Sequence, residues 1–184
     1  MRRAVPWLVG ALLVAAAGVA VAATPPEISE TRALEIRGAA DEAVTGRTLT
    51  AQVLDASFAD RVTVSGGWGA DGRWLVVTVA ASAPRTEVDA AIRLATLTFD
   101  GRVFQASERP GTSLLDTDLR VGTDTVGLLA FELPADADAE AADLRLSTTY
   151  STPQLDDILV IPIALDAVPT VAEIEIVEPE WVWS

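Results

Sequence analysis

Apolar and polar residues alternate along most of the chain, with a period of two rather than the 3.6 residues of a helix. Such alternation places the apolar side chains on one face of a strand. The run 73–80 is almost continuously apolar, which predicts a central strand covered on more than one side. The other predicted strands are residues 33–37, 49–54, 61–65, 92–99, 102–106, 126–133, 143–147 and 157–165.

Turn residues separate these runs. Asp100-Gly101 predicts a two-residue hairpin with a type I′ turn. Residues 66–72 are predicted to be a turn region before the central strand, with the turn itself at 69–73. Pro162 lacks a backbone N–H, so its half of the last strand is expected at a sheet edge. Many short strands with turns between them predict an all-β fold, an immunoglobulin-like antiparallel β-sandwich over residues 32–166.

Two tryptophans flank the predicted turn before the central strand. Trp68 and Trp74 form either an exposed aromatic platform or part of the core. Because Trp74 begins the central strand, it is expected in the core. Trp68 lies before the turn, where it could cap one end of the sandwich or remain partly exposed.

A second tryptophan pair lies in residues 167–184, which are predicted to be an acidic tail or an edge strand. Trp181 and Trp183 are two residues apart, so on an extended chain both rings face the same way. They either pack back on the domain or form a docking site for a partner or for a bilayer interface, where tryptophan is enriched. The neighbouring glutamates disfavour the bilayer.

The first 23 residues are typical of an export signal, expected to form a hydrophobic helix. Two arginines precede the apolar run 7–23, and cleavage after Ala22 or Ala23 would release the domain. Without cleavage, the same run would hold the chain in the cell membrane with the domain outside. Residues 24–31 are then a short spacer, and the mature protein is either tethered or secreted.

The composition excludes most of the well-known catalytic mechanisms. The 184 residues include no His and no Cys, and all 13 cations are Arg. The chain therefore has no imidazole base, no thiolate nucleophile or zinc cage, and no lysine for a Schiff base. Paired carboxylates remain possible, but Asp156 and Asp157 are neighbours whose side chains should point to opposite faces of a strand. We expect no enzyme activity, no cofactor and no resident metal.

The net charge is −14. Such a surface repels phosphate groups, so nucleic acid is not an expected partner, whereas a cation or a basic partner would be attracted. Asp116, Asp118 and Asp124 lie close together in the sequence and could supply oxygen ligands to Ca²⁺. The alternative is that they are solvated loop residues.

Three segments resemble the telokin-like immunoglobulin-fold domains of uncharacterised exported actinobacterial and firmicute proteins, a superfamily that includes the mycobacterial immunoprotective extracellular antigen. They are GRWLVVTVAASA (72–83), LATLTFDGRVFQAS (94–107) and LRVGTDTVGLLAFELP (119–134). Phe104 stands where the family has Tyr, and Val121 replaces its Pro. The resemblance implies a secreted or surface-tethered sandwich without established catalytic residues. Many members are lipoproteins held by a Cys, which this chain lacks.

Two functions are consistent with these observations. The first is a non-catalytic extracellular interaction module that holds another envelope or membrane protein, through a sheet face, loops or the second tryptophan pair. The alternative is an extracellular domain that senses or binds Ca²⁺ or a small ligand.

Overall fold

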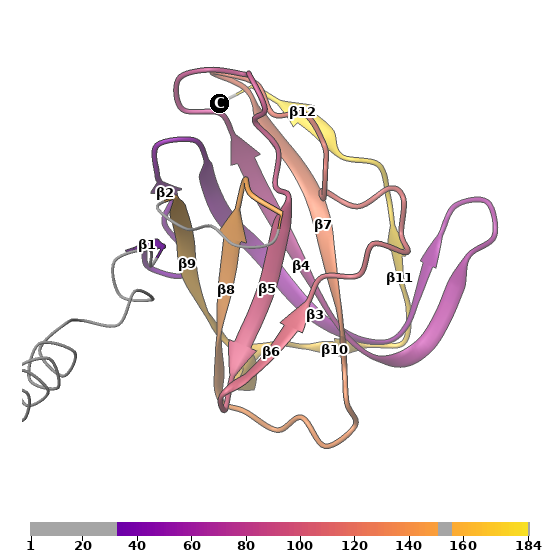
Figure 1. The fold of residues 1–184 in the computed structure, drawn as a ribbon. Helices are drawn as coiled ribbons and strands as arrows, with labels where there is room; N and C mark the ends of the chain where they lie inside the picture. The colour runs from indigo at the N-terminus through magenta and orange to yellow at the C-terminus, as the bar shows by residue number, and fades with distance from the viewer. Residues whose placement is uncertain (1–32, 151–155, 184) are drawn as a thin grey trace, which may run out of the picture. The chain divides into compact units, whose positions relative to one another are not determined.

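Two β-sheets form the part of the chain that the computed structural model describes, residues 33–150 and 156–183 (Figure 1). The predicted leader 1–23 and spacer 24–31 lie outside these residues. In spatial order the first sheet contains β1 (Leu34–Arg37), β9 (Asp157–Ala164), β8 (Ala141–Ser147), β5 (Leu94–Phe99) and β6 (Arg102–Gln105). The second contains β10 (Thr170–Val171), β3 (Thr50–Val64), β4 (Gly69–Ser82), β7 (Asp124–Leu133) and β12 (Glu180–Val182), while β2 (Val44–Thr45) and β11 (Ile174–Ile176) also pair with β3.

The main core lies between the two sheets. Alternate residues of β4 (Leu75, Val77 and Val79) belong to one buried cluster with Leu144 of β8 and Ile161 of β9. Burial of a Val, Leu or Ile side chain contributes roughly 1.5–3 kcal/mol, so this aliphatic layer supplies much of the stability. The predicted all-β class and the sandwich of two sheets are confirmed.

Strand directions differ from the prediction of a purely antiparallel sandwich. β1 runs parallel to β9, and both β10 and β11 run parallel to β3. Parallel neighbours need a long connection, and these pairs join the two ends of the described chain to strands far away in the sequence. The period of apolar residues identifies a strand but not the direction of its neighbour, so this mixture had no signal in the sequence.

The turn before the central strand lies earlier than predicted. Gly66 and Gly67 have φ angles of 102° and 129°, which cost glycine little, and β4 begins at Gly69. Asp71, predicted in the turn, lies opposite Arg61 of β3 and forms an ion pair with it. The prediction of a turn over 69–73 was therefore wrong, because the glycine pair supplies the positive φ angles and the cross-strand pair continues the ladder.

Two other local predictions are confirmed. Asp100 and Gly101 form the two-residue loop between β5 and β6, both with positive φ (51° and 71°), as a type I′ turn requires. β1 pairs with β9 only over 157–160. Among the described strands, the Pro162 half of β9 consequently has β8 as its neighbour on one side and no strand on the other.

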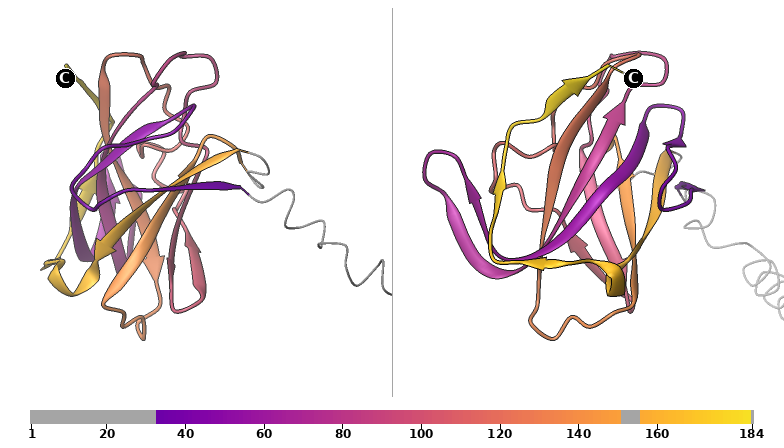
Figure 2. Two further views of the ribbon diagram at one scale, coloured as in Figure 1. Left: turned by 90° about the vertical axis from the view of Figure 1, so that its left-hand side faces the viewer. Right: turned by 180° about the vertical axis from the view of Figure 1, so that it is seen from behind.

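A segment that we call the C-terminal strap, residues 168–183, follows a 3₁₀ turn at Leu165–Ala167 and crosses the outer face of the second sheet. It pairs first with β3 and finally with β7 at the opposite edge, and the right-hand view of Figure 2 shows it in front of the sheet. Beneath it lies a smaller buried cluster, here the outer core: Ala59, Val62, Trp74, Val76, Ala130 and Ile176. β4 is thus covered on both faces, as predicted.

No helix within residues 33–150 and 156–183 has the length and apolar character needed to cross a membrane. The run 7–23 lies outside these ranges.

Candidate functional site

Trp181 and Trp183 are both exposed, with 60% and 85% of their surface accessible. β12 pairs antiparallel with β7, and Trp181 lies opposite Thr125. Directly opposed residues of such a pair point to the same face of the sheet, and alternate residues of one strand share a face. Because Thr125 is fully buried on the side of the main core, Trp181 projects from that same side, and Trp183 follows it if the extended chain continues.

The guanidinium of Arg120 packs over the indole ring of Trp181. The guanidinium carbon lies 4.3 Å from the centre of the indole ring. A cation above an exposed aromatic ring contributes about 0.5–1 kcal/mol, enough to favour one ring position without burying it. The sequence carries no signal of this contact, because Arg120 belongs to the loop before β7 and only strand pairing brings it next to β12.

A hollow of about 550 Å³ lies beside the tryptophan. One wall is the loop that contains residues 111–113 and Thr117, and the other is the segment 178–181 that ends in Trp181. The lining combines two carboxylates, two threonine hydroxyls, a proline ring and an indole ring. Such a surface can contact a partner through both apolar area and hydrogen bonds.

The two walls of this hollow are fixed to the sheet. Thr112 Oγ1 donates a hydrogen bond to the Ile176 carbonyl oxygen at 2.7 Å. At Gly127 of β7, a Cβ atom would lie 3.0 Å from Leu114 and 3.1 Å from Pro179. Only glycine lets the loop and the strap approach β7 so closely from two sides. Rigid walls reduce the entropy lost when a partner binds.

β12 is also the last strand of its sheet. On a strand with one neighbour, alternate backbone N–H and C=O groups point away from the sheet and can pair with another chain. Exposed Glu178 and Glu180 flank this edge, and Asp124 of β7 lies opposite Val182. The edge therefore combines backbone hydrogen-bonding groups, two exposed indoles and negative charge. We refer to β12 with Trp183 as the tryptophan edge.

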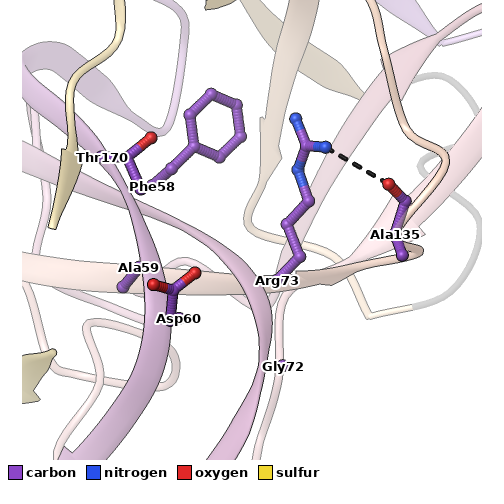
Figure 3. A pocket seen from close by; sticks show the side chains of 7 residues that line it. All are labelled: Phe58, Ala59, Asp60, Gly72, Arg73, Ala135 and Thr170. Carbon is purple, nitrogen blue, oxygen red and sulfur yellow. Dashed lines mark hydrogen bonds between the residues drawn. The ribbon is translucent and has the colours of Figure 1, made fainter. Parts of the chain in front are cut away.

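A second hollow, of about 530 Å³, lies between β3, β4 and β10 (Figure 3). Phe58 and Arg73 point into it from neighbouring strands, with the guanidinium carbon 5.1 Å from the ring centre. Arg73 also donates a long hydrogen bond, 3.4 Å, to the Ala135 carbonyl oxygen. Asp60 and Thr170 complete the polar lining. These groups can hold a polar molecule, but the exposed aromatic area is smaller than at the tryptophan edge.

The three aspartates predicted as calcium ligands are not brought together. Asp116 accepts hydrogen bonds from Arg93 Nη1 at 3.1 Å and from the Tyr150 hydroxyl at 2.9 Å. The hydrogen bond of Arg93 to Tyr150, aided by Asp116, raises the pKa of the Arg93 guanidinium. Asp118 is exposed, and Asp124 begins β7. In the described ranges, no three acidic side chains gather in a way that could hold a metal ion.

Asp156 and Asp157 do not point to opposite sides, contrary to the prediction. Asp157 Oδ1 accepts a hydrogen bond from Arg47 Nε at 3.1 Å, and Asp156 Oδ1 accepts one from Nη2 of the same arginine at 3.0 Å. Asp157 Oδ2 also accepts the Arg47 backbone N–H at 2.6 Å. Asp156 precedes the first residue of β9, so the alternation of a strand does not apply to it. Both carboxylates tie the turn after β2 to β9.

Compared by sequence, the chain matches no protein-family profile and no curated protein. Among solved structures, it is similar to a proposed lipoprotein from Staphylococcus aureus subsp. aureus NCTC 8325, with 9% identity and a TM-score of 0.46 over 72% of this chain and 93% of that one. It is also similar to an uncharacterised β-sandwich protein from Clostridium difficile 630, with 11% identity and a TM-score of 0.45 over 76% and 99% of the two chains. At these values neither likeness identifies a family or a function, and the telokin-like family remains a resemblance in sequence.

Proposed function

We propose that the chain is a non-catalytic, exported interaction module with an immunoglobulin-like sandwich, which holds another protein of the bacterial cell envelope at the tryptophan edge. The observation that carries this proposal is the exposure of Trp181, on a strand that is paired with the sheet, and of Trp183 just beyond that strand. The lack of His, Cys and Lys supports a role in binding rather than catalysis.

Exposed tryptophans have a cost that a binding role explains. Leaving a large apolar side chain in water forgoes roughly 1.5–3 kcal/mol of burial. Tryptophan is also among the residues that most often dominate the binding energy of protein interfaces. At the tryptophan edge, Trp181 lines a hollow with fixed walls and Trp183 is exposed two residues further on, so a partner would bury them without reordering the sheet.

The experiment is covalent crosslinking in intact cells of the source organism, followed by isolation of the full-length chain. Deletion of residues 167–184 is unsuitable as a test, because it removes Ile176 from the outer core. The double substitution Trp181→Ala and Trp183→Ala should abolish the crosslinked complexes. Val88→Ala with Val103→Ala, two exposed apolar residues outside the strap, is the matched control and should leave them intact.

Equal melting temperatures of the variants would show that the fold is retained. Recovery of the same complexes with the tryptophan variant as with the unmodified chain would contradict the proposed function. Loss of the complexes in both variants would contradict it as well, because the effect would then not be specific to the tryptophan edge.

A further inference from the structure

We propose that the partner contributes an extended, basic segment that pairs with β12 as an added strand. This inference rests on the proposed function and names the chemistry of its partner. It follows from three properties of the tryptophan edge: its open backbone, the opposite character of its two faces, and its charge.

The unpaired backbone groups on the free edge of β12 favour an extended partner segment. β12 has β7 as its only neighbour among the described strands, so one edge of β12 is available for hydrogen bonds to another chain. Addition of a strand to an exposed sheet edge is a recurrent mode of peptide recognition, in which the main chain supplies affinity and alternate side chains supply specificity.

The two faces of β12 differ. Trp181 lies opposite Thr125 and projects on the side of the main core, whereas Glu180 lies opposite Val126 and projects on the outer side. An added strand would therefore place every second side chain beside the indoles and the others beside Glu180. Aliphatic residues suit the first set and Arg or Lys the second. The expected segment alternates apolar and basic residues.

Charge favours this occupant over two others. The chain carries a net charge of −14, and exposed Glu178 and Glu180 flank the edge. A basic segment is attracted to such a surface, while a second copy of the same chain is repelled, and so is an anionic lipid surface. Arg120 is a cation near β12, and its guanidinium lies over the ring of Trp181.

The test is calorimetric titration of the full-length chain, in a non-ionic detergent, with acetyl-Val-Arg-Val-Arg-Val-Arg-Val-amide. Binding is expected, with protection of the β12 amides against hydrogen exchange. The counterpart with Glu in place of Arg should not bind, because its charge is reversed. The fully N-methylated basic peptide should not bind either, because it keeps the side chains but has no N–H groups for an added strand.

Matched variants separate the edge from general attraction. Trp181→Ala with Trp183→Ala keeps the net charge and should weaken binding of the basic peptide at least about tenfold. Glu178→Gln with Glu180→Gln should weaken it by about fivefold or more. Asp136→Asn with Asp138→Asn also removes two negative charges, but from exposed positions beyond the other end of β7. This variant should leave the affinity for the basic peptide nearly unchanged.

The inference is overturned if the N-methylated peptide binds as well as its parent, if the β12 amides stay unprotected, or if the Asp136 and Asp138 variant loses as much affinity as the glutamate variant. Self-association of the chain, or binding to phosphatidylglycerol vesicles, would also overturn it if either depends on the two tryptophans. Where cellular crosslinking depends on the tryptophans but the peptide results fail, the proposed function stands and this inference falls. Crosslinking that does not depend on the tryptophans would contradict the proposed function itself.

Discussion

The chain places two pairs of tryptophans in opposite environments. Trp74 is fully buried in the outer core, and Trp68 is half-buried with its ring edge-on to Trp74, 6.3 Å between the ring centres. Trp181 lies on a strand of the same sheet and Trp183 follows the end of that strand, yet both are mostly exposed. The residue type is the same, and both pairs are next to strands.

The two tryptophan pairs differ in what packs over them. The strap passes over Trp74, where Ile176 is fully buried against the same cluster. Beyond that point the strap becomes the last strand of the sheet, where Arg120 lies over the ring of Trp181 but both tryptophans remain mostly exposed. One segment therefore closes the outer core with its middle and forms the tryptophan edge with its end. Burial makes the first pair part of the stability of the fold, and exposure leaves the second pair available for a partner.

The largest expected effect is at Trp74. Trp74→Ala should lower the free energy of unfolding by about 3–5 kcal/mol, because it leaves a cavity in a covered core. Trp74→Phe should cost less, since among described residues the buried indole N–H has no acceptor, so its loss breaks no hydrogen bond. Urea unfolding measures both. A cost below about 1 kcal/mol for the alanine variant would show that the outer core does not stabilise the domain.

A smaller but still clear effect is expected at the strap itself. Ile176→Ala should cost about 2–5 kcal/mol, as for other buried aliphatic residues. Its neighbour Val177 is 51% exposed, and Val177→Ala should change stability by less than about 0.5 kcal/mol. Urea unfolding of the two variants checks whether the strap is a packed part of the domain. Equal, small effects would mean that it is not.

The smallest effect on stability is expected at the exposed pair. Trp181→Ala should cost about 0.5–1 kcal/mol, because the contact with Arg120 is lost. Trp183→Ala should change the free energy of unfolding by less than about 0.5 kcal/mol. The same denaturation experiment measures both. A cost above about 2 kcal/mol for either would contradict the distinction between a buried and an exposed pair.

Local patterns predicted much of the sandwich. The nearly continuous apolar run 73–80 identified the central strand and its cover on both faces, and Asp100-Gly101 identified a hairpin. The turn before the central strand was misplaced, because two adjacent turn signals competed and only the ion pair of Arg61 with Asp71 shows which of them continues the ladder. Such a pair depends on register, which the order of residues along one strand does not contain.

By itself, the sequence determined the all-β class, the chemistry that the chain lacks, its acidity and the presence of two tryptophan pairs, because these follow from residue types and from short-range periodicity. The sequence also placed Trp74 in the core, because it begins the central strand, but only the tertiary structure decided that Trp181 and Trp183 are left exposed. Burial depends on segments distant in sequence: Ile176 packs in the same cluster as Trp74, and Arg120 lies over Trp181. β12 is an edge strand because it pairs with β7 on one side and with no described strand on the other. Contacts of this kind arise from the packing of whole elements, and no local pattern around a tryptophan records them.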